Sequence, residues 1–184
     1  KEICRYQKRR FGLDYCYDKE CIVTVGGSEA IDLAFRAIIN PGDEVILLQP
    51  SYVAYTPGVA LAGGKVVNIE LKEDNEFKLT PELLEAAITP KTKAILLNYP
   101  SNPTGGFMTR EDYEKIVSII KKHEIIVITD EIYAELSYEQ KFCSIAAFDE
   151  IKDQVILVSG YSKAYAMTGW RLGYVLANEV LTKA

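Results

Sequence analysis

The chain has 184 residues, of which 48% are hydrophobic and 26% are charged, and its formal net charge is −5. This length predicts one domain with a sizeable core, and the composition excludes a disordered, collagen-like or low-complexity protein. The negative charge argues against a nucleic acid or an anionic membrane as a partner, because no net field attracts the chain to phosphate groups.

Cysteine and histidine usage argues against a metal site and against a histidine-dependent nucleophile. The four cysteines form no CxxC motif, and His123 is the only histidine. Zinc sites need more thiols and imidazoles at closer spacing, and Ser-His-Asp or Cys-His catalysis needs a histidine beside the nucleophile. We interpret His123 as a residue near a helix C-terminus and the cysteines as reduced thiols of a cytoplasmic protein.

The chain shows no targeting or membrane segment. Residues 1–3 contain no apolar signal region, and the sequence lacks an initiator methionine, so we expect a fragment. The longest uncharged run, 45–64, contains prolines and glycines, which indicate a strand, a loop and the start of a helix.

Strand and helix patterns alternate along the chain. A polar helix is predicted over 1–11, with Gly12 beyond it, and an apolar helix face follows Gly26-Gly27. Thr80-Pro81 opens one later helix, and a capping box with Asp in place of Glu at 109–112 opens another that runs to about residue 124. The predicted strands cover 21–25, 45–48, 65–71, 93–98, 125–129, 155–159 and 172–177.

This alternation predicts an α/β fold with a mostly parallel sheet, in which ligands bind at the carboxyl ends of the strands. Polar groups follow four of the predicted strands and should therefore meet. These groups are Gly26-Gly27-Ser28 after the first strand, the turn 99–105, Asp130 with Tyr133, and Ser162 with Lys163.

Two of these groups have both a functional and a structural interpretation. Gly26-Gly27-Ser28 leads from strand into helix, where free N–H groups bind phosphate, although an ordinary turn also uses glycine. The glycines form neither a P-loop nor GxGxxG, so a nicotinamide site is unsupported. Asp130 ends a buried strand and needs a cation or donors; it could face a ligand's ring nitrogen or cap a turn.

Lys163 and Arg171 complete a recognisable set. A lysine near another cation and away from water has a depressed pKa and can form an imine. An arginine can hold a phosphate through two parallel hydrogen bonds, although Arg171 could equally form a surface ion pair. An imine-forming lysine, phosphate donors, an aspartate and aromatic rings are together what pyridoxal phosphate requires.

The motifs also resemble a known family. The strings VTVGGSEAIDLA, INPGDEV, PSYVAY, SNPTGG, TDEIYAEL and YSKAYAMTGWRLGY are similar to those of the fold-type I, class I and II aminotransferases, especially the prokaryotic aspartate and aromatic branch. The resemblance runs from about residue 13 to 177. It implies a three-layer α-β-α fold and transamination between an amino acid and a 2-keto acid with pyridoxal 5′-phosphate.

The resemblance implies a role for each matching residue. Lys163 would hold the cofactor as an internal aldimine and move the substrate proton, and Asp130 would pair with the pyridinium nitrogen. Tyr133 and Asn102 would hydrogen-bond the ring hydroxyl oxygen, and Tyr52 would stack on the ring. We therefore predict Lys163, Asp130 and Tyr133 as catalytic residues.

The remaining implied contacts hold the cofactor phosphate. They are the backbone amides of Gly27, Ser28 and Glu29, the Ser162 hydroxyl and the Arg171 guanidinium. We interpret Trp170 as a packing residue that supports the loop carrying Arg171, whereas Tyr55 could lie in the core or beside the cofactor.

The resemblance further implies that residues 1–184 are one domain, the large cofactor-binding domain. The N-terminal segment that closes over the substrate and the C-terminal small domain would then be absent. We accordingly expect poor activity from this chain alone and a homodimer in the full-length parent. Alternatives are a pyridoxal-phosphate-dependent C–S β-lyase or aminocyclopropane-forming enzyme on the same fold, and a non-catalytic domain.

Overall fold

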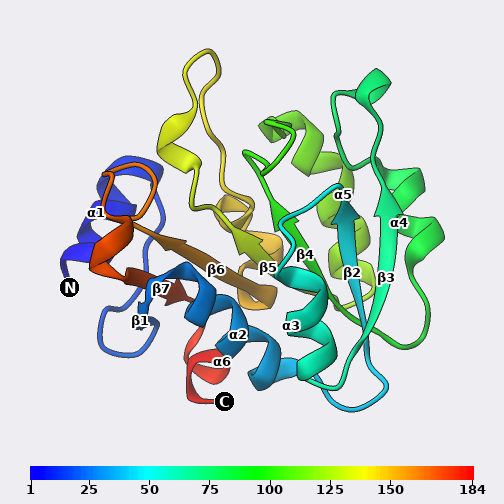
Figure 1. Ribbon diagram of the computed structural model, residues 1–184, viewed down its shortest axis with the longest axis horizontal. Coiled ribbons are helices and arrows are strands. Elements are labelled where there is room, and N and C mark those ends of the chain that lie inside the picture. Colours follow the sequence, from blue (N-terminus) through cyan, green and yellow to red (C-terminus); the bar gives the residue numbers. More distant parts are fainter.

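Seven strands form one sheet in the order β1-β7-β6-β5-β4-β2-β3 in the computed structural model, which describes all 184 residues (Figure 1). Strand β7 is antiparallel to both of its neighbours, and the other adjacent pairs are parallel. Six strands therefore end at one edge of the sheet, and β7 begins there. The strands are β1 (Cys21–Val25), β2 (Glu44–Gln49), β3 (Lys65–Glu70), β4 (Thr92–Asn98), β5 (Ile126–Asp130), β6 (Val155–Gly160) and β7 (Leu172–Leu176).

Helices cover both faces of this sheet, so the expected three-layer α/β architecture is confirmed (Figure 1). Helix α2 packs on β1, β5, β6 and β7, and α3 packs on β2 and β3. Helices α4 and α5 pack against each other on the opposite face. The helices are α1 (Glu2–Phe11), α2 (Gly26–Ile38), α3 (Tyr55–Leu61), α4 (Pro81–Ala87), α5 (Arg110–Lys122) and α6 (Glu179–Lys183).

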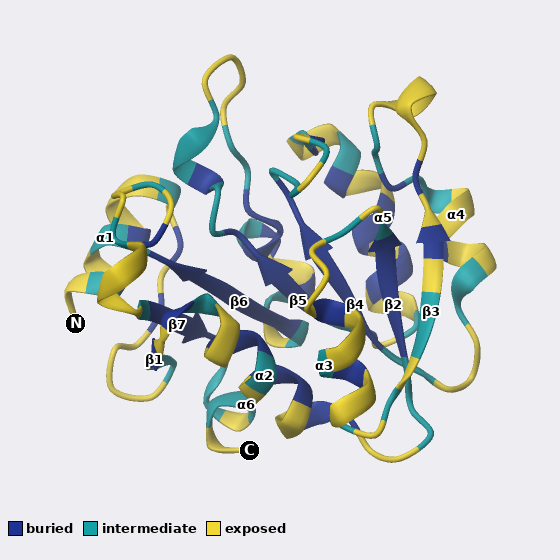
Figure 2. Ribbon diagram, viewed as in Figure 1, coloured by how far each residue is buried: buried dark blue, intermediate teal, exposed yellow.

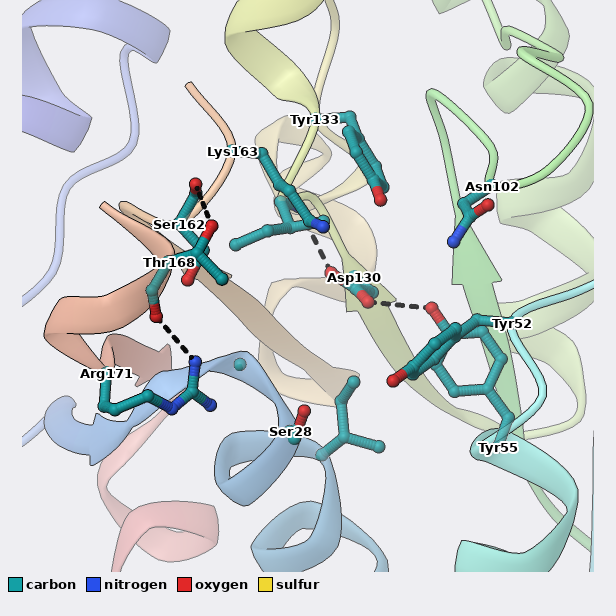
Figure 3. A pocket seen from close by; sticks show the side chains of 13 residues that line it. Ser28, Tyr52, Tyr55, Asn102, Asp130, Tyr133, Ser162, Lys163, Thr168 and Arg171 are labelled. Carbon is teal, nitrogen blue, oxygen red and sulfur yellow. Dashed lines mark hydrogen bonds between the residues drawn. The ribbon is translucent and has the colours of Figure 1, made fainter. Parts of the chain in front are cut away.

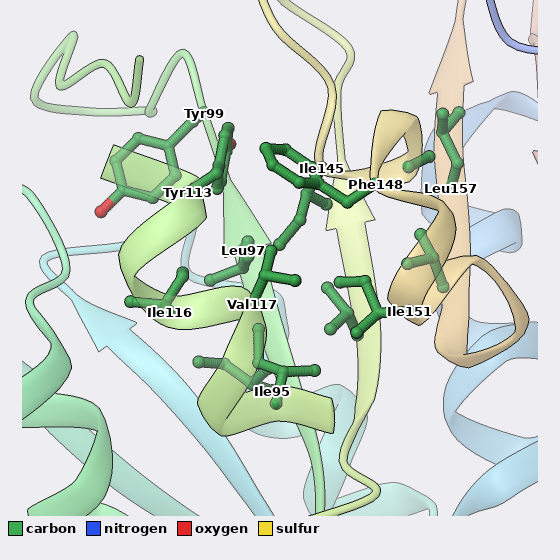
Figure 4. Packing of buried hydrophobic residues seen from close by; sticks show 14 of the residues in the cluster. Ile95, Leu97, Tyr99, Tyr113, Ile116, Val117, Ile145, Phe148, Ile151 and Leu157 are labelled. Atoms are coloured by element: carbon green, nitrogen blue, oxygen red, sulfur yellow. The ribbon is translucent and has the colours of Figure 1, made fainter. Parts of the chain in front are cut away.

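The central strands are buried on both faces, and their alternation divides the core into two clusters (Figure 2). Ile95 and Leu97 of β4 pack with Ile116 of α5 in the larger cluster (Figure 4). In β5, Val127 joins that cluster, whereas Ile128 faces the cluster formed with α2 and α3. By the same period of two, Asp130 lies on the α2 and α3 face at the carboxyl end of β5.

The predicted helix signals are present at the helix ends. Gly12 follows α1 in the left-handed conformation with φ 75°, and the Thr80 hydroxyl accepts from the Leu83 amide at the start of α4. The Thr109–Asp112 capping box opens α5, and His123 directly follows its last residue. Each strand begins and ends within one residue of its predicted bounds.

Two features of the fold were not anticipated. One is the pair of short 3₁₀ helices η2 (Ala134–Leu136) and η5 (Thr168–Trp170). Each contains only three residues, which is too few for an apolar repeat to be recognised in the sequence. The other is Trp170, whose expected packing role is wrong for this chain, since the residue is 75% exposed.

No helix of the fold combines the length and the apolar character that a membrane span requires.

Candidate active site

The polar groups from the strand ends meet around one cavity of about 320 Å³ (Figure 3). The cavity lies at the edge where β1, β4, β5 and β6 end and β7 begins. Every predicted site residue except Glu29 lines it. The lining residues are Gly27, Ser28, Ile31, Tyr52, Tyr55, Asn102, Asp130, Ile132, Tyr133, Ser162, Lys163, Thr168 and Arg171.

The amino end of α2 forms one wall of the cavity, and glycines allow it to pack closely on β7. Gly26 has φ +78°, and a Cβ added at Gly173 would lie 2.6 Å from the backbone nitrogen of Gly27. Only a residue without a side chain fits at either position. The first amides of this 13-residue helix, including those of Gly27 and Ser28, have no partner within the helix and carry its positive dipole end.

Arg171 brings a second positive group to the same wall. Its guanidinium donates to the carbonyl oxygens of Thr168 (3.1 Å) and Val25 (3.3 Å) and forms no ion pair with a carboxylate. A Cβ at Gly26 would lie 2.9 Å from the guanidinium carbon, so the cation rests against the start of α2. Two uncompensated positive groups side by side favour an anion between them, and a phosphate has the matching charge and acceptors.

Asp130 places a buried carboxylate at the opposite side of the cavity. It is 6% exposed; its Oδ2 accepts from the Tyr55 hydroxyl at 2.7 Å, and its Oδ1 accepts from the Ile132 amide at 3.2 Å (Figure 3). Burial raises the pKa of Asp130, although these two donors and the charge of Lys163 oppose the shift. A buried carboxylate without a bonded cation favours a cationic N–H group on a ligand.

Lys163 and Tyr133 extend toward the cavity from the segments that follow β6 and β5. The Lys163 Nζ lies 5.8 Å from the centre of the Tyr133 ring. Lys163 forms no ion pair with a carboxylate, which leaves its amine available. The expectation that this lysine lies away from water is wrong, because in this chain the residue is exposed beside the cavity.

Tyr52 and Asn102 stand at the β2 and β4 side of the cavity. The Tyr52 ring is 39% exposed and packs edge-on against Tyr55, with 5.5 Å between ring centres. The backbone amide of Asn102 donates to Oδ1 of Asn98 (2.9 Å). Nδ2 of Asn98 in turn donates to the backbone carbonyl oxygen of Asp130 (2.9 Å). Asn98 therefore ties the Asn102 turn to the end of β5.

Tyr55, Asn98 and Thr168 support the site, yet the sequence did not assign them to it. Tyr55 was left open and proves to be both core and site, since it is 2% exposed and bonds Asp130. Thr168 donates to the Ser162 carbonyl oxygen at 3.1 Å. The only sequence signal for Asn98 is a polar residue at the end of an apolar strand.

Glu29 and Glu131 lie outside the cavity. The Glu29 carboxylate accepts from the Val25 amide, so a role for its own backbone amide in holding phosphate stays a prediction. Glu131 is 3% exposed on the other face of the sheet and accepts from Ser144 (2.6 Å) and Thr129 (3.1 Å). Burial raises the pKa of Glu131 to about 8.

Comparisons with known proteins identify the family of the chain. The family model "Aminotransferase class I and II" matches residues 1–184. The chain belongs to the class I and II aminotransferase family. The predicted resemblance is thus confirmed.

Individual relatives show how far the likeness extends. The chain is 52% identical to a putative aminotransferase, YugH, of Bacillus subtilis over all of its length and 48% of that protein. It is 42% identical to an aspartate aminotransferase of Geobacillus stearothermophilus, with 100% and 47% of the two chains covered. The structure of an aromatic aminotransferase from Pyrococcus horikoshii superimposes with a TM-score of 0.96 at 37% identity, covering 98% and 49%. The chain thus spans about half the length of the relatives it matches.

Proposed function

We propose that the protein takes part in transamination between an amino acid and a 2-keto acid, with pyridoxal phosphate as its cofactor and Lys163 as the covalent anchor. One observation carries the proposal. The cavity joins an available lysine amine to an anion-binding wall on one side and a buried, cation-free carboxylate on the other. These three features match the aldehyde, the phosphate and the ring nitrogen of this cofactor.

The residues that would hold the phosphate are those of the α2 wall. The amides of Gly27, Ser28 and Glu29 would donate to it, together with the Ser162 hydroxyl and the Arg171 guanidinium. The helix dipole and the cation act on the same anion, and each charge-assisted hydrogen bond is worth about 1.5–3 kcal/mol.

The residues that would hold the ring lie across the cavity. Asp130 would keep the ring nitrogen protonated, because opposite charges close together stabilise each other. The cationic ring N–H would in turn lower the free-energy cost of burying the Asp130 carboxylate. Tyr133 and Asn102 would donate to the ring hydroxyl oxygen, and Tyr52 would stack on the ring face. When bound, the cofactor supplies an electron sink for the substrate α-carbon.

Lys163 would have a second role as a proton carrier. A lysine amine released from a covalent bond is a base at the position it has just left. Lys163 would thus accept the proton of the substrate α-carbon and return it to the cofactor carbon on the other side of the substrate nitrogen. The substrates are an amino acid and a 2-keto acid.

The whole protein is proposed to act as a homodimer in the cytoplasm. The four cysteines are free, which suits a reducing compartment. Residues 1–184 are proposed to form its large cofactor-binding domain. The proposal includes no nucleic acid, membrane or metal, and no three His, Cys, Asp or Glu side chains are grouped to hold a metal ion.

The test is to map the site of covalent attachment. The chain is mixed with pyridoxal phosphate and reduced with borohydride, and the modified lysines are identified by mass spectrometry. Dominant labelling at Lys163, lost in Lys163→Ala, is expected. An even distribution over the remaining lysines, with no preference for Lys163, would refute the assignment. Lys152→Ala is a matched control, because this lysine lies outside the cavity lining.

A further inference from the structure

A carboxylate outside the cavity, Glu135, connects helix α1 with the turn that follows Tyr133. The Tyr6 hydroxyl donates to Glu135 Oε1 at 2.5 Å. The Arg10 guanidinium donates from Nε to both carboxylate oxygens (2.9 and 3.1 Å) and from Nη2 to Oε2 (2.9 Å). Tyr6 and Arg10 are four residues apart and thus share one face of α1.

The environment of this carboxylate makes the contact stronger than an ordinary surface ion pair. The Glu135 side chain is 21% exposed, although that of Arg10 is 57% exposed. Its pKa is lowered, chiefly by the hydrogen bond from Arg10 and further by the one from Tyr6. A forked guanidinium–carboxylate pair also fixes the orientation of both groups, which a single contact does not.

The same cluster reaches the loop that carries Lys163. Tyr6, Glu135, Ala164 and Tyr165 line one small cavity, and Tyr165 is close enough to Tyr6 to raise the pKa of its hydroxyl. In Figure 1 this orange loop lies beside the blue helix α1. Tyr165 stands two residues after Lys163, just as Glu135 stands two residues after Tyr133.

The Tyr133 turn and the Lys163 loop are each held by a few backbone hydrogen bonds of short span, whereas α1 is also bonded to the sheet. The η2 turn is closed by the Leu136 amide bonding the Tyr133 carbonyl oxygen (2.8 Å), and the loop by the Ala166 amide bonding the Lys163 carbonyl oxygen (3.3 Å). Gln7 of α1, in contrast, is 2% exposed and bonds the Tyr174 hydroxyl of β7 at 2.7 Å.

We propose that Glu135 is a positioning residue that clamps the Tyr133 turn and the Lys163 loop to α1, and thereby fixes the Tyr133 ring relative to the Lys163 amine. The purpose of this clamp, positioning Tyr133 and Lys163 for the reaction, rests on the proposed function. Its existence depends on the contacts of Glu135 with Tyr6 and Arg10, so it can be measured with no cofactor present.

The first measurement is amide hydrogen exchange of the chain without cofactor. Glu135→Ala should speed the exchange of the Leu136 and Ala166 amides together, by roughly three- to tenfold each, because both segments lose their common attachment. Glu135→Gln keeps an acceptor for Tyr6 and should give an intermediate effect. Glu179→Ala is the control, since it removes an ion pair between distant segments, Lys19–Glu179, away from the cavity.

The second measurement is the rate at which pyridoxal phosphate and borohydride label Lys163. Glu135→Ala should lower this rate roughly three- to tenfold, Glu135→Gln less, and Glu179→Ala not at all. If Lys163 of the unaltered chain is not labelled preferentially, the proposed function fails, while the exchange experiment still decides the clamp. If Glu135→Ala alters the Leu136 amide but leaves Ala166 unchanged, or alters neither, the clamp does not exist.

Discussion

Replacing Tyr55 by phenylalanine tests whether Asp130 is held as a buried charge. The Tyr55 hydroxyl is one of two donors to the Asp130 carboxylate, at 2.7 Å, and the two residues are 2% and 6% exposed. A hydrogen bond to a charged group contributes about 1.5–3 kcal/mol, and its loss leaves a buried oxygen unsatisfied. Tyr55→Phe should therefore lower the free energy of unfolding by about 1.5–3 kcal/mol at neutral pH.

The matched control is Tyr99→Phe. Tyr99 is also 2% exposed, but its hydroxyl donates to a neutral acceptor, the Phe77 carbonyl oxygen, at 2.9 Å. Its loss should cost about 0.5–1.5 kcal/mol. Urea unfolding followed by circular dichroism measures both values, and the difference between the two variants isolates the charge of Asp130.

The pH dependence of the free energy of unfolding tests the same carboxylate. Burial raises the pKa of Asp130 in the folded state, so the folded chain holds its proton to higher pH than the unfolded chain. Between the two pKa values stability then falls as pH rises, and the cost of burying the charge is complete above the folded pKa. The effect of Tyr55→Phe should shrink when Asp130 is protonated at acid pH. Equal, pH-independent costs for Tyr55→Phe and Tyr99→Phe would refute this reasoning.

Three further predictions concern the α2 wall and the opposite face of the sheet. Arg171→Ala should weaken pyridoxal phosphate binding in equilibrium dialysis by roughly tenfold or more, with Arg171→Lys intermediate; unchanged affinity would remove Arg171 from the phosphate site. Glu131→Gln should flatten the pH profile of the urea midpoint. The raised pKa of Glu131, about 8, makes wild-type stability fall as pH rises from the ordinary glutamate range through that value. An identical profile in the variant would show that Glu131 does not titrate there. Gly173→Ala should lower the free energy of unfolding by about 2 kcal/mol or more, because its Cβ would lie 2.6 Å from the Gly27 nitrogen, and a change below 0.5 kcal/mol would contradict that packing.

Local sequence signals determined the succession of elements in this protein. Continuous apolar runs such as AILL at 94–97 and IIVI at 125–128 indicate buried strands. Gly12, Thr80 and the Thr109 capping box mark helix ends, because these signals act over a few residues of backbone. The rule that parallel strands end at a common edge was enough to expect that Asp130 and Lys163 would share a site.

Contacts between distant segments could be decided only by the tertiary structure. The link from Tyr55 to Asp130 spans 75 residues and that from Glu135 to Arg10 spans 125, and no local pattern encodes either. Exposure likewise depends on which elements surround a side chain. Lys163 and Trp170 are exposed in this chain, although the flanking sequence suggested otherwise. Tyr55, whose position the sequence left open, is buried because β2 and α3 place it against the end of β5.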